Sequence, residues 1–170
     1  MHIFLVGISH RYQVEGHGAD AEWRTFSSFL ESLVRARPVD LIAEELTEEV
    51  IFLCHAADSV ARAVAGRFGM RHLFCDPDSA ERNRLGIKGR REIILELGYS
   101  GLLSPEQSEK VDAVEEGHWD KREHYWLERI RELKHDSCIF ILGANHVERF
   151  CRLLESVSIS WEVIEKDWVP

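Results

Sequence analysis

Two short runs of apolar residues, residues 3–6 and 139–142, contain no polar residue at alternate positions. An uninterrupted run of branched and aromatic residues is typical of a strand that is buried on both faces, as in a parallel sheet covered by helices. Further strand-like runs occupy residues 39–43 and 71–75, and an alternating run at residues 161–164 predicts an edge strand that could run antiparallel. The pattern predicts an α/β fold, a single-domain three-layer sandwich with a mainly parallel sheet of about five strands.

The segments between these runs have the spacing of amphipathic helices. Alternation of strand and helix implies right-handed crossovers and a doubly wound sheet. Cap residues are expected at Asp20, at Ser104 with Pro105 and Gln107, and at Asp120. The expected helices are residues 20–37, 48–68 with breaks at Gly66 and Gly69, 90–97, a helix starting near 105, 121–133 and 147–154.

Composition excludes some classes of protein. A chain of 170 residues that is 45% hydrophobic fits one ordinary domain. The formal net charge of −9 argues against a nonspecific nucleic-acid or anionic-membrane binder. No apolar run is long enough to span a bilayer and the start lacks the pattern of a signal peptide, so we expect a cytoplasmic protein without membrane association. The four cysteines show no C-x-x-C spacing and are expected to be buried and reduced.

The two most apolar runs are each followed by the motif G-x-x-H, as Gly7 to His10 and as Gly143 to His146. A glycine lets the chain turn sharply at the end of a strand, and the histidine then projects into the crevice where open α/β sheets bind ligands. A histidine there can accept a proton or bind a metal. Alone, His10 could merely hydrogen-bond a carbonyl of the loop that includes residues 16–18. Its repetition at His146 favours a site.

The second motif leads into a helix. Asn145 is a favourable N-cap and Glu148 completes a capping-box pattern, which places His146 in the first helical turn. The helix dipole disfavours an imidazolium at that end, so His146 should be neutral, as a general base or a metal ligand must be.

Acidic residues follow the other strands. Glu44 and Glu45 end the second strand and should point to opposite sides, so only one faces the crevice. Asp76 holds the corresponding place after the third strand. These carboxylates could be ligands or bases, or else a solvated pair and a simple turn.

Residues 115–124 are dense in ionisable groups. Asp120 as a cap with Glu123 three residues later explains two of them structurally. Arg122 could hold a substrate carboxylate or phosphate, or a developing oxyanion, or it could form a surface ion pair. The basic cluster at residues 82–91 is either a rim for an anionic substrate or a solvated face. The residues predicted to contact substrate are Arg11, Asp76, Arg82, Arg84 and His124.

The order of these motifs resembles the superfamily that joins TraB/Tiki-type, ChaN-like and erythromycin-esterase-like proteins. The matching elements are the two G-x-x-H motifs, Glu45-Leu46, Asp76, and the run from Arg122 and Glu123 to Trp126. The resemblance spans nearly the whole chain and favours Glu45 over Glu44. The chain departs from the pattern at Glu123, where the family usually has Asp, and at Trp126, where Met is common.

The resemblance implies hydrolases and ligand binders: metal-dependent proteases, esterases that use His and Glu, and proteins linked to haem iron. We expect a hydrolase in which His10, Glu45 and His146 act on a water, directly or through a divalent metal ion (Mn, Co or Zn), with Arg122 and Glu123 also catalytic. The substrate would be a small molecule or peptide with an ester, peptide or phosphoester bond. The alternatives are a noncatalytic module that binds a small ligand, a metal or haem, and a nucleotide or nucleic-acid phosphoesterase. The sequence is compatible with a homodimer.

Overall fold

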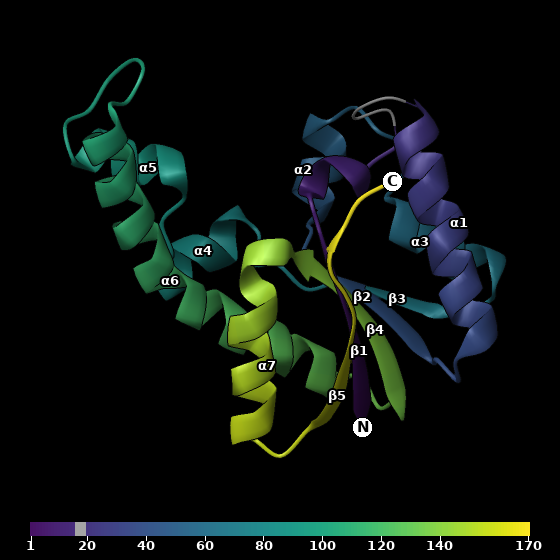
Figure 1. Ribbon diagram of the computed structural model, residues 1–170. Helices are drawn as coiled ribbons and strands as arrows, with labels where there is room; N and C mark the ends of the chain where they lie inside the picture. The colour runs from purple at the N-terminus through teal and green to yellow at the C-terminus, as the bar shows by residue number, and fades with distance from the viewer. Residues whose placement is uncertain (16–19) are drawn as a thin grey trace.

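The structure, a computed structural model, describes residues 1–15 and 20–170 and contains one sheet of five parallel strands (Figure 1). The strand order is β3-β2-β4-β1-β5. The predicted α/β fold is therefore confirmed. The strands are β1 (His2–Ile8), β2 (Leu41–Glu44), β3 (Arg71–Phe74), β4 (Ser137–Gly143) and β5 (Ser160–Trp168).

Helices cover both faces of the sheet (Figure 1). On one face α1 and α3 bury Phe26 and Val64 against Val6 and its neighbours, and on the other α6 and α7 bury Trp126 and Phe150. This arrangement is a three-layer sandwich. The helices are α1 (Asp20–Ala36), α2 (Glu48–Leu53), α3 (Val60–Arg67), α4 (Ser79–Leu85), α5 (Arg90–Glu96), α6 (Pro105–Glu132) and α7 (Val147–Ser156).

One helix prediction is wrong, and the edge strand does not take the antiparallel direction that the sequence left open. Residues 48–68 form two helices rather than one, because Thr47 caps α2 and Ser59 caps α3 through their side-chain oxygens. Strand β5 lies at the predicted edge but runs parallel to β1. The reason is that α7 carries the chain back along the sheet, so β4 and β5 start at the same end.

Helix α6 is one continuous helix where the sequence predicted a helix start near 105 and a separate helix at 121–133. Ser104 and Gln107 form the expected capping box with Pro105 in the first turn. Asp120 lies inside the helix, so its predicted role as a cap is wrong. The first half of α6 projects away from the sheet together with α5 (Figure 1). Helix α4 was not among the predicted helices.

The junction between β4 and α7 also differs from the prediction. The chain makes a 3₁₀ turn at Ala144–His146, and α7 begins without a side-chain cap. Helical backbone thus starts before α7, so Asn145 lies inside the turn and its side chain is exposed. Glu148 forms an ion pair with Lys166 instead of completing a capping box. The predicted loop at residues 16–18 and the predicted cap contact of Asp20 lie outside the described residues.

Two further findings concern membrane spans and cysteines. No helix in the part that the structure describes combines the length and the hydrophobicity that crossing a lipid bilayer requires. The four cysteines are free thiols, three of them buried. Burial raises the pKa of the Cys75 and Cys138 thiols, which suits a role in core packing.

Candidate functional site

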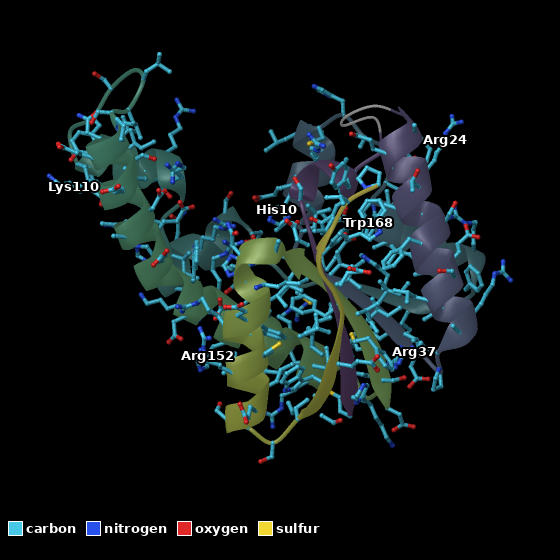
Figure 2. All side chains as sticks on the ribbon, in the orientation of Figure 1. His10, Arg24, Arg37, Lys110, Arg152 and Trp168 are labelled. Carbon is cyan, nitrogen blue, oxygen red and sulfur yellow. The ribbon has the colours of Figure 1, made fainter. Side chains whose placement is uncertain are left out.

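Three neighbouring strands, β2, β4 and β1, end side by side and bring His10, Glu45 and His146 together. Glu45 Oε1 lies 3.7 Å from His10 Nε2 and 3.9 Å from His146 Nε2. Figure 2 shows His10 at the end of the sheet that lies opposite the N-terminus marked in Figure 1. Both separations exceed hydrogen-bond length, so the two imidazoles face the carboxylate without bonding to it.

The glycines of both G-x-x-H motifs are explained by close packing and not by the predicted sharp turn. Neither has a positive φ. A Cβ at Gly143 would lie 3.1 Å from His10 Nε2 and 3.3 Å from Glu45 Oε2. A Cβ at Gly7 would lie 1.9 Å from the backbone oxygen of Lys166. Gly143 therefore makes room for the site, and Gly7 lets β5 approach β1.

Glu45 is held rigidly. Its side chain is 2% exposed. Oε2 accepts a hydrogen bond from the Gly143 amide at 2.7 Å, and Oε1 accepts one from Arg122 Nη2 at 2.7 Å. Glu44 points to the other face of the sheet, where it accepts hydrogen bonds from Ser59 and from His72. The expectation that only one of the two glutamates faces the crevice is thus met, and that residue is Glu45.

His146 is oriented by a buried acid from α6. Its Nδ1 donates to Glu123 Oε1 at 2.9 Å, and the Glu123 side chain is 3% exposed. Arg149 Nε donates to the same oxygen at 3.1 Å. Trp119 and Trp126 each pack against the imidazole in a T-shaped arrangement, with ring centroids 4.6 and 5.0 Å away. Because Nδ1 carries the hydrogen, Nε2 presents its lone pair to the site.

His10 is oriented by a different kind of group. It opens a 3₁₀ turn, His10–Tyr12, directly after β1, and its Nδ1 lies 2.6 Å from Gln13 Oε1. Gln13 is fully buried, whereas the His10 side chain is 51% exposed. The two histidines therefore differ in both partner and exposure: His146 is enclosed beside a carboxylate, and His10 stands at the mouth of the site beside an amide.

Asp76 and Arg122 form a buried ion pair beside Glu45. Arg122 Nη2 and Nε donate to Asp76 Oδ1 at 2.8 and 3.1 Å, and Trp126 Nε1 donates to it at 2.9 Å. Arg82 donates to the other oxygen of Asp76. Burial by itself raises the pKa of Asp76, but the two arginines and the hydrogen bonds from Arg122 and Trp126 outweigh it and lower that pKa below its ordinary value. Burial opposes charge on Arg122 too, yet Glu45 and Asp76 raise its pKa.

A cavity of about 1040 Å³ opens above these residues, between the strand ends and the first half of α6. His10, Glu45 and His146 line its floor. Arg122 Nη1 makes no hydrogen bond with the described residues, and the residue lines the same cavity. The cavity therefore offers two imidazole rings and a guanidinium to a bound molecule. The α4–α6 side of its wall includes Arg82, Arg90, Glu115, Glu116 and Trp119.

Several predicted substrate contacts lie elsewhere. Arg11 bonds to Tyr12 and Glu22, Arg84 pairs with Glu81, and His124 bonds to the backbone oxygen of Asp120; none of the three lines the cavity. Arg82 does line the cavity, although its guanidinium is paired with Asp76.

Two further members of the basic cluster are paired with acids within the projecting part of the chain. Lys88 pairs with Glu96, and Arg90 pairs with Asp112 and Glu115. These contacts neutralise much of the proposed anionic-substrate rim.

Reasoning from sequence missed Gln13, Trp119 and Arg149. Gln13 stands three residues after His10 in a 3₁₀ turn, which is the only local signal that could have pointed to it. Trp119 and Arg149 meet around His146 from α6 and α7, and no spacing in the sequence relates two helices that are separated by a strand.

The donor set bears on the expected metal ion. Two imidazoles with fixed Nδ1 partners and one carboxylate are ligands that a divalent metal accepts. However, Glu45 already receives hydrogen bonds on both oxygens. No group of three or more His, Cys, Asp or Glu side chains among the described residues has the arrangement of a metal site. The metal therefore remains a prediction.

Comparisons of the chain with models of protein families, with curated proteins and with solved structures found no match.

Proposed function

We propose that this protein is a hydrolase in which His146 acts as the general base. One observation carries the proposal: the Nε2 atoms of His10 and His146 face Glu45 Oε1 across gaps of 3.7 and 3.9 Å, at the floor of a large cavity. A water molecule between the imidazoles has two hydrogens, one for each Nε2 lone pair. Its oxygen lone pairs then remain free to attack a substrate in the cavity.

The buried acid Glu123 suits His146 to the role of base. When Nε2 takes the proton of the attacking water, the ring becomes a cation whose Nδ1–H still donates to Glu123. Glu45 lies near the same ring and adds a second negative charge. His10 has an amide as its Nδ1 partner and is half exposed, so its part is to orient the water.

Arg122 supplies the positive charge. As the water oxygen bonds to the electrophilic carbon or phosphorus, charge develops on the substrate oxygen, and the free Nη1 of Arg122 donates to it. The bond to the leaving group then breaks, and the leaving group takes the proton from His146 Nε2, which restores the neutral imidazole. Glu45 and Asp76 fix the guanidinium in place throughout.

The proposed substrate is a small molecule or a peptide with an ester, peptide or phosphoester bond, which the cavity can accommodate. A divalent ion, if bound, would be held by His10, Glu45 and His146 and would act as a Lewis acid. The observation that favours it is the meeting of two imidazole lone pairs and a carboxylate oxygen. The same feature supports the second candidate, a module that binds a metal ion without turnover.

The test combines elemental analysis of the purified protein with rate measurements on ester, peptide and phosphoester substrates. We expect His146→Ala to lower the rate by about 10²–10⁴-fold, the usual contribution of general-base catalysis. His10→Ala should lower it less, because this residue only orients the water.

His2→Ala is the matched control, because His2 lies at the other end of β1 and bonds to Ser160. It should leave the rate unchanged. If neither His10→Ala nor His146→Ala alters hydrolysis or metal content, the proposed site is wrong. Stoichiometric metal without turnover of any substrate would favour the binding module instead.

A further inference from the structure

A second polar network lies behind His10, inside the protein. Gln13 and Glu44 are both fully buried, and Gln13 Nε2 donates to Glu44 Oε2 at 3.3 Å. His72 Nε2 donates to Glu44 Oε1 at 2.8 Å, and Ser59 Oγ donates to the same oxygen. Glu44 therefore receives three donors and has no contact with the cavity. Burial of a carboxylate costs free energy, and hydrogen bonds offset that cost only when the donors are held in place.

The network fixes which way the Gln13 amide faces. If the amide were flipped, its oxygen would meet the carboxylate of Glu44, and two acceptors would repel each other. The NH₂ group must therefore face Glu44, and Oε1 must face His10. The amide oxygen can only accept, so the hydrogen between it and the ring belongs to His10 Nδ1.

The backbone around Gln13 is also anchored. The Gln13 carbonyl accepts a hydrogen bond from Val60 N at 2.8 Å, and Val14 forms an antiparallel bridge with Ser59. Ser59 is at the same time the N-cap of α3. The segment after β1 is thus docked on the start of α3, and the Gln13 side chain has no freedom to leave His10.

We propose that Gln13, held by Glu44, is the positioning residue that keeps His10 in the tautomer with its hydrogen on Nδ1 and its Nε2 lone pair facing Glu45. The consequence for catalysis rests on the proposed function, but the tautomer does not. The two histidines then have distinct tasks. His146 has a carboxylate behind it and stabilises a proton, whereas His10 has a neutral amide behind it and acts as a fixed acceptor.

The test reads the tautomer directly. Long-range ¹H–¹⁵N spectra of uniformly ¹⁵N-labelled protein distinguish a protonated ring nitrogen from one with a lone pair. They are recorded at about pH 8, above the ordinary histidine pKa of about 6.5, with a chelator present so that no metal fixes the ring. His10→Ala and His146→Ala identify the two sets of signals. In the unaltered protein we expect hydrogen on Nδ1 of both rings.

Gln13→Met removes the amide while keeping a side chain of similar size. It should shift the His10 signals to those of mixed tautomers and leave the His146 signals unchanged. The double variant Gln13→Glu with Glu44→Gln exchanges carboxylate and amide and should restore hydrogen on Nδ1 of His10. A loss of fold in either variant would show in circular dichroism and would leave the spectrum of the unaltered protein as the deciding measurement.

Two results would overturn the proposal: hydrogen on Nε2 of His10 in the unaltered protein, or His10 signals that do not change in a folded Gln13→Met variant. The proposed hydrolysis fails separately. If the tautomer is as expected and no substrate is turned over, Gln13 still positions His10, but for binding and not for catalysis.

Discussion

Among single residues, Asp76 has the most demanding electrostatic role. It neutralises Arg82 and Arg122 while nearly buried, and its lowered pKa shows that these partners outweigh the cost of burial. Without this carboxylate, Arg122 would keep Glu45 as its one acidic partner. The position of the cation beside the cavity therefore depends on a residue that does not line the cavity itself.

Asp76→Asn should lower the free energy of unfolding at pH 7 by roughly 3 kcal/mol, because it breaks a buried ion pair and leaves charge on the arginines. The folded-state pKa of Asp76 is lowered, so its stabilisation is present above the unfolded value of about 3.9 and is lost as pH falls through the lower folded value. The difference between the two proteins in urea unfolding should thus shrink below about pH 4.

Glu162→Gln provides the control for that measurement. Glu162 pairs with Arg37 on the surface, and both side chains are substantially exposed. The loss of this pair should change the unfolding free energy far less than Asp76→Asn does. Equal effects of the two substitutions would show that Asp76 is not a buried anchor.

The sequence predicted some of the residues that contact the two histidines and missed others. The period of two predicted that Glu44 and Glu45 diverge, but only the resemblance selected Glu45. Local spacing explained Glu123 only as the partner of a cap at Asp120, and the resemblance alone made it a site residue. Its actual contact, His146, lies 23 residues later on another element. Hydrogen bonds between distant elements leave no local pattern, and therefore Gln13 and Glu44 could not be paired in advance.

Among the elements, α6 differs most from the prediction. Two stretches with separate caps merged into one helix because Asp120 faces solvent and the backbone continues through Gly117. Local capping signals cannot show that a helix continues past them, since Asp and Glu also suit an exposed helical surface. The Ser104 start was predictable because its capping box and Pro105 involve only neighbouring residues.

The continuity of α6 through Gly117 predicts that a substitution at this position stabilises the protein. Gly117 is exposed, and a Cβ added there would meet nothing within 4 Å. Gly117→Ala should therefore stabilise the protein by about 0.5–1 kcal/mol in urea unfolding, because alanine loses less backbone freedom than glycine in a helix.

The matched change at Gly7 should have the opposite effect. A Cβ at Gly7 would lie 1.9 Å from the Lys166 backbone oxygen and 2.6 Å from Val147 Cγ2. Gly7→Ala should therefore destabilise the protein by at least about 2 kcal/mol, since the backbones of β1 and β5 cannot both stay in place. Destabilisation by Gly117→Ala as well would contradict a continuous α6.

For the whole molecule, four strands were predicted from apolar runs and β5 from an alternating run, but the order β3-β2-β4-β1-β5 was not predicted. Burial on both faces makes a strand recognisable, yet it says nothing about which strand lies beside it. The insertion of β4 between β2 and β1 is what places the ends of three strands from distant parts of the chain around one point. The expectation that histidines and an acid meet there followed from a general property of parallel sheets, that sites form at their carboxyl ends.

The long helix α6 has a consequence for the geometry of the cavity. Its 28 residues extend about 42 Å, and one rod carries both Trp119 in the cavity wall and Glu123 behind His146. Each residue advances the helix by about 100° of rotation. Trp119 and Glu123 are four residues apart and therefore lie on nearly the same side of α6, so one residue inserted between them would rotate the Trp119 side chain by about 100° around the helix axis relative to Glu123.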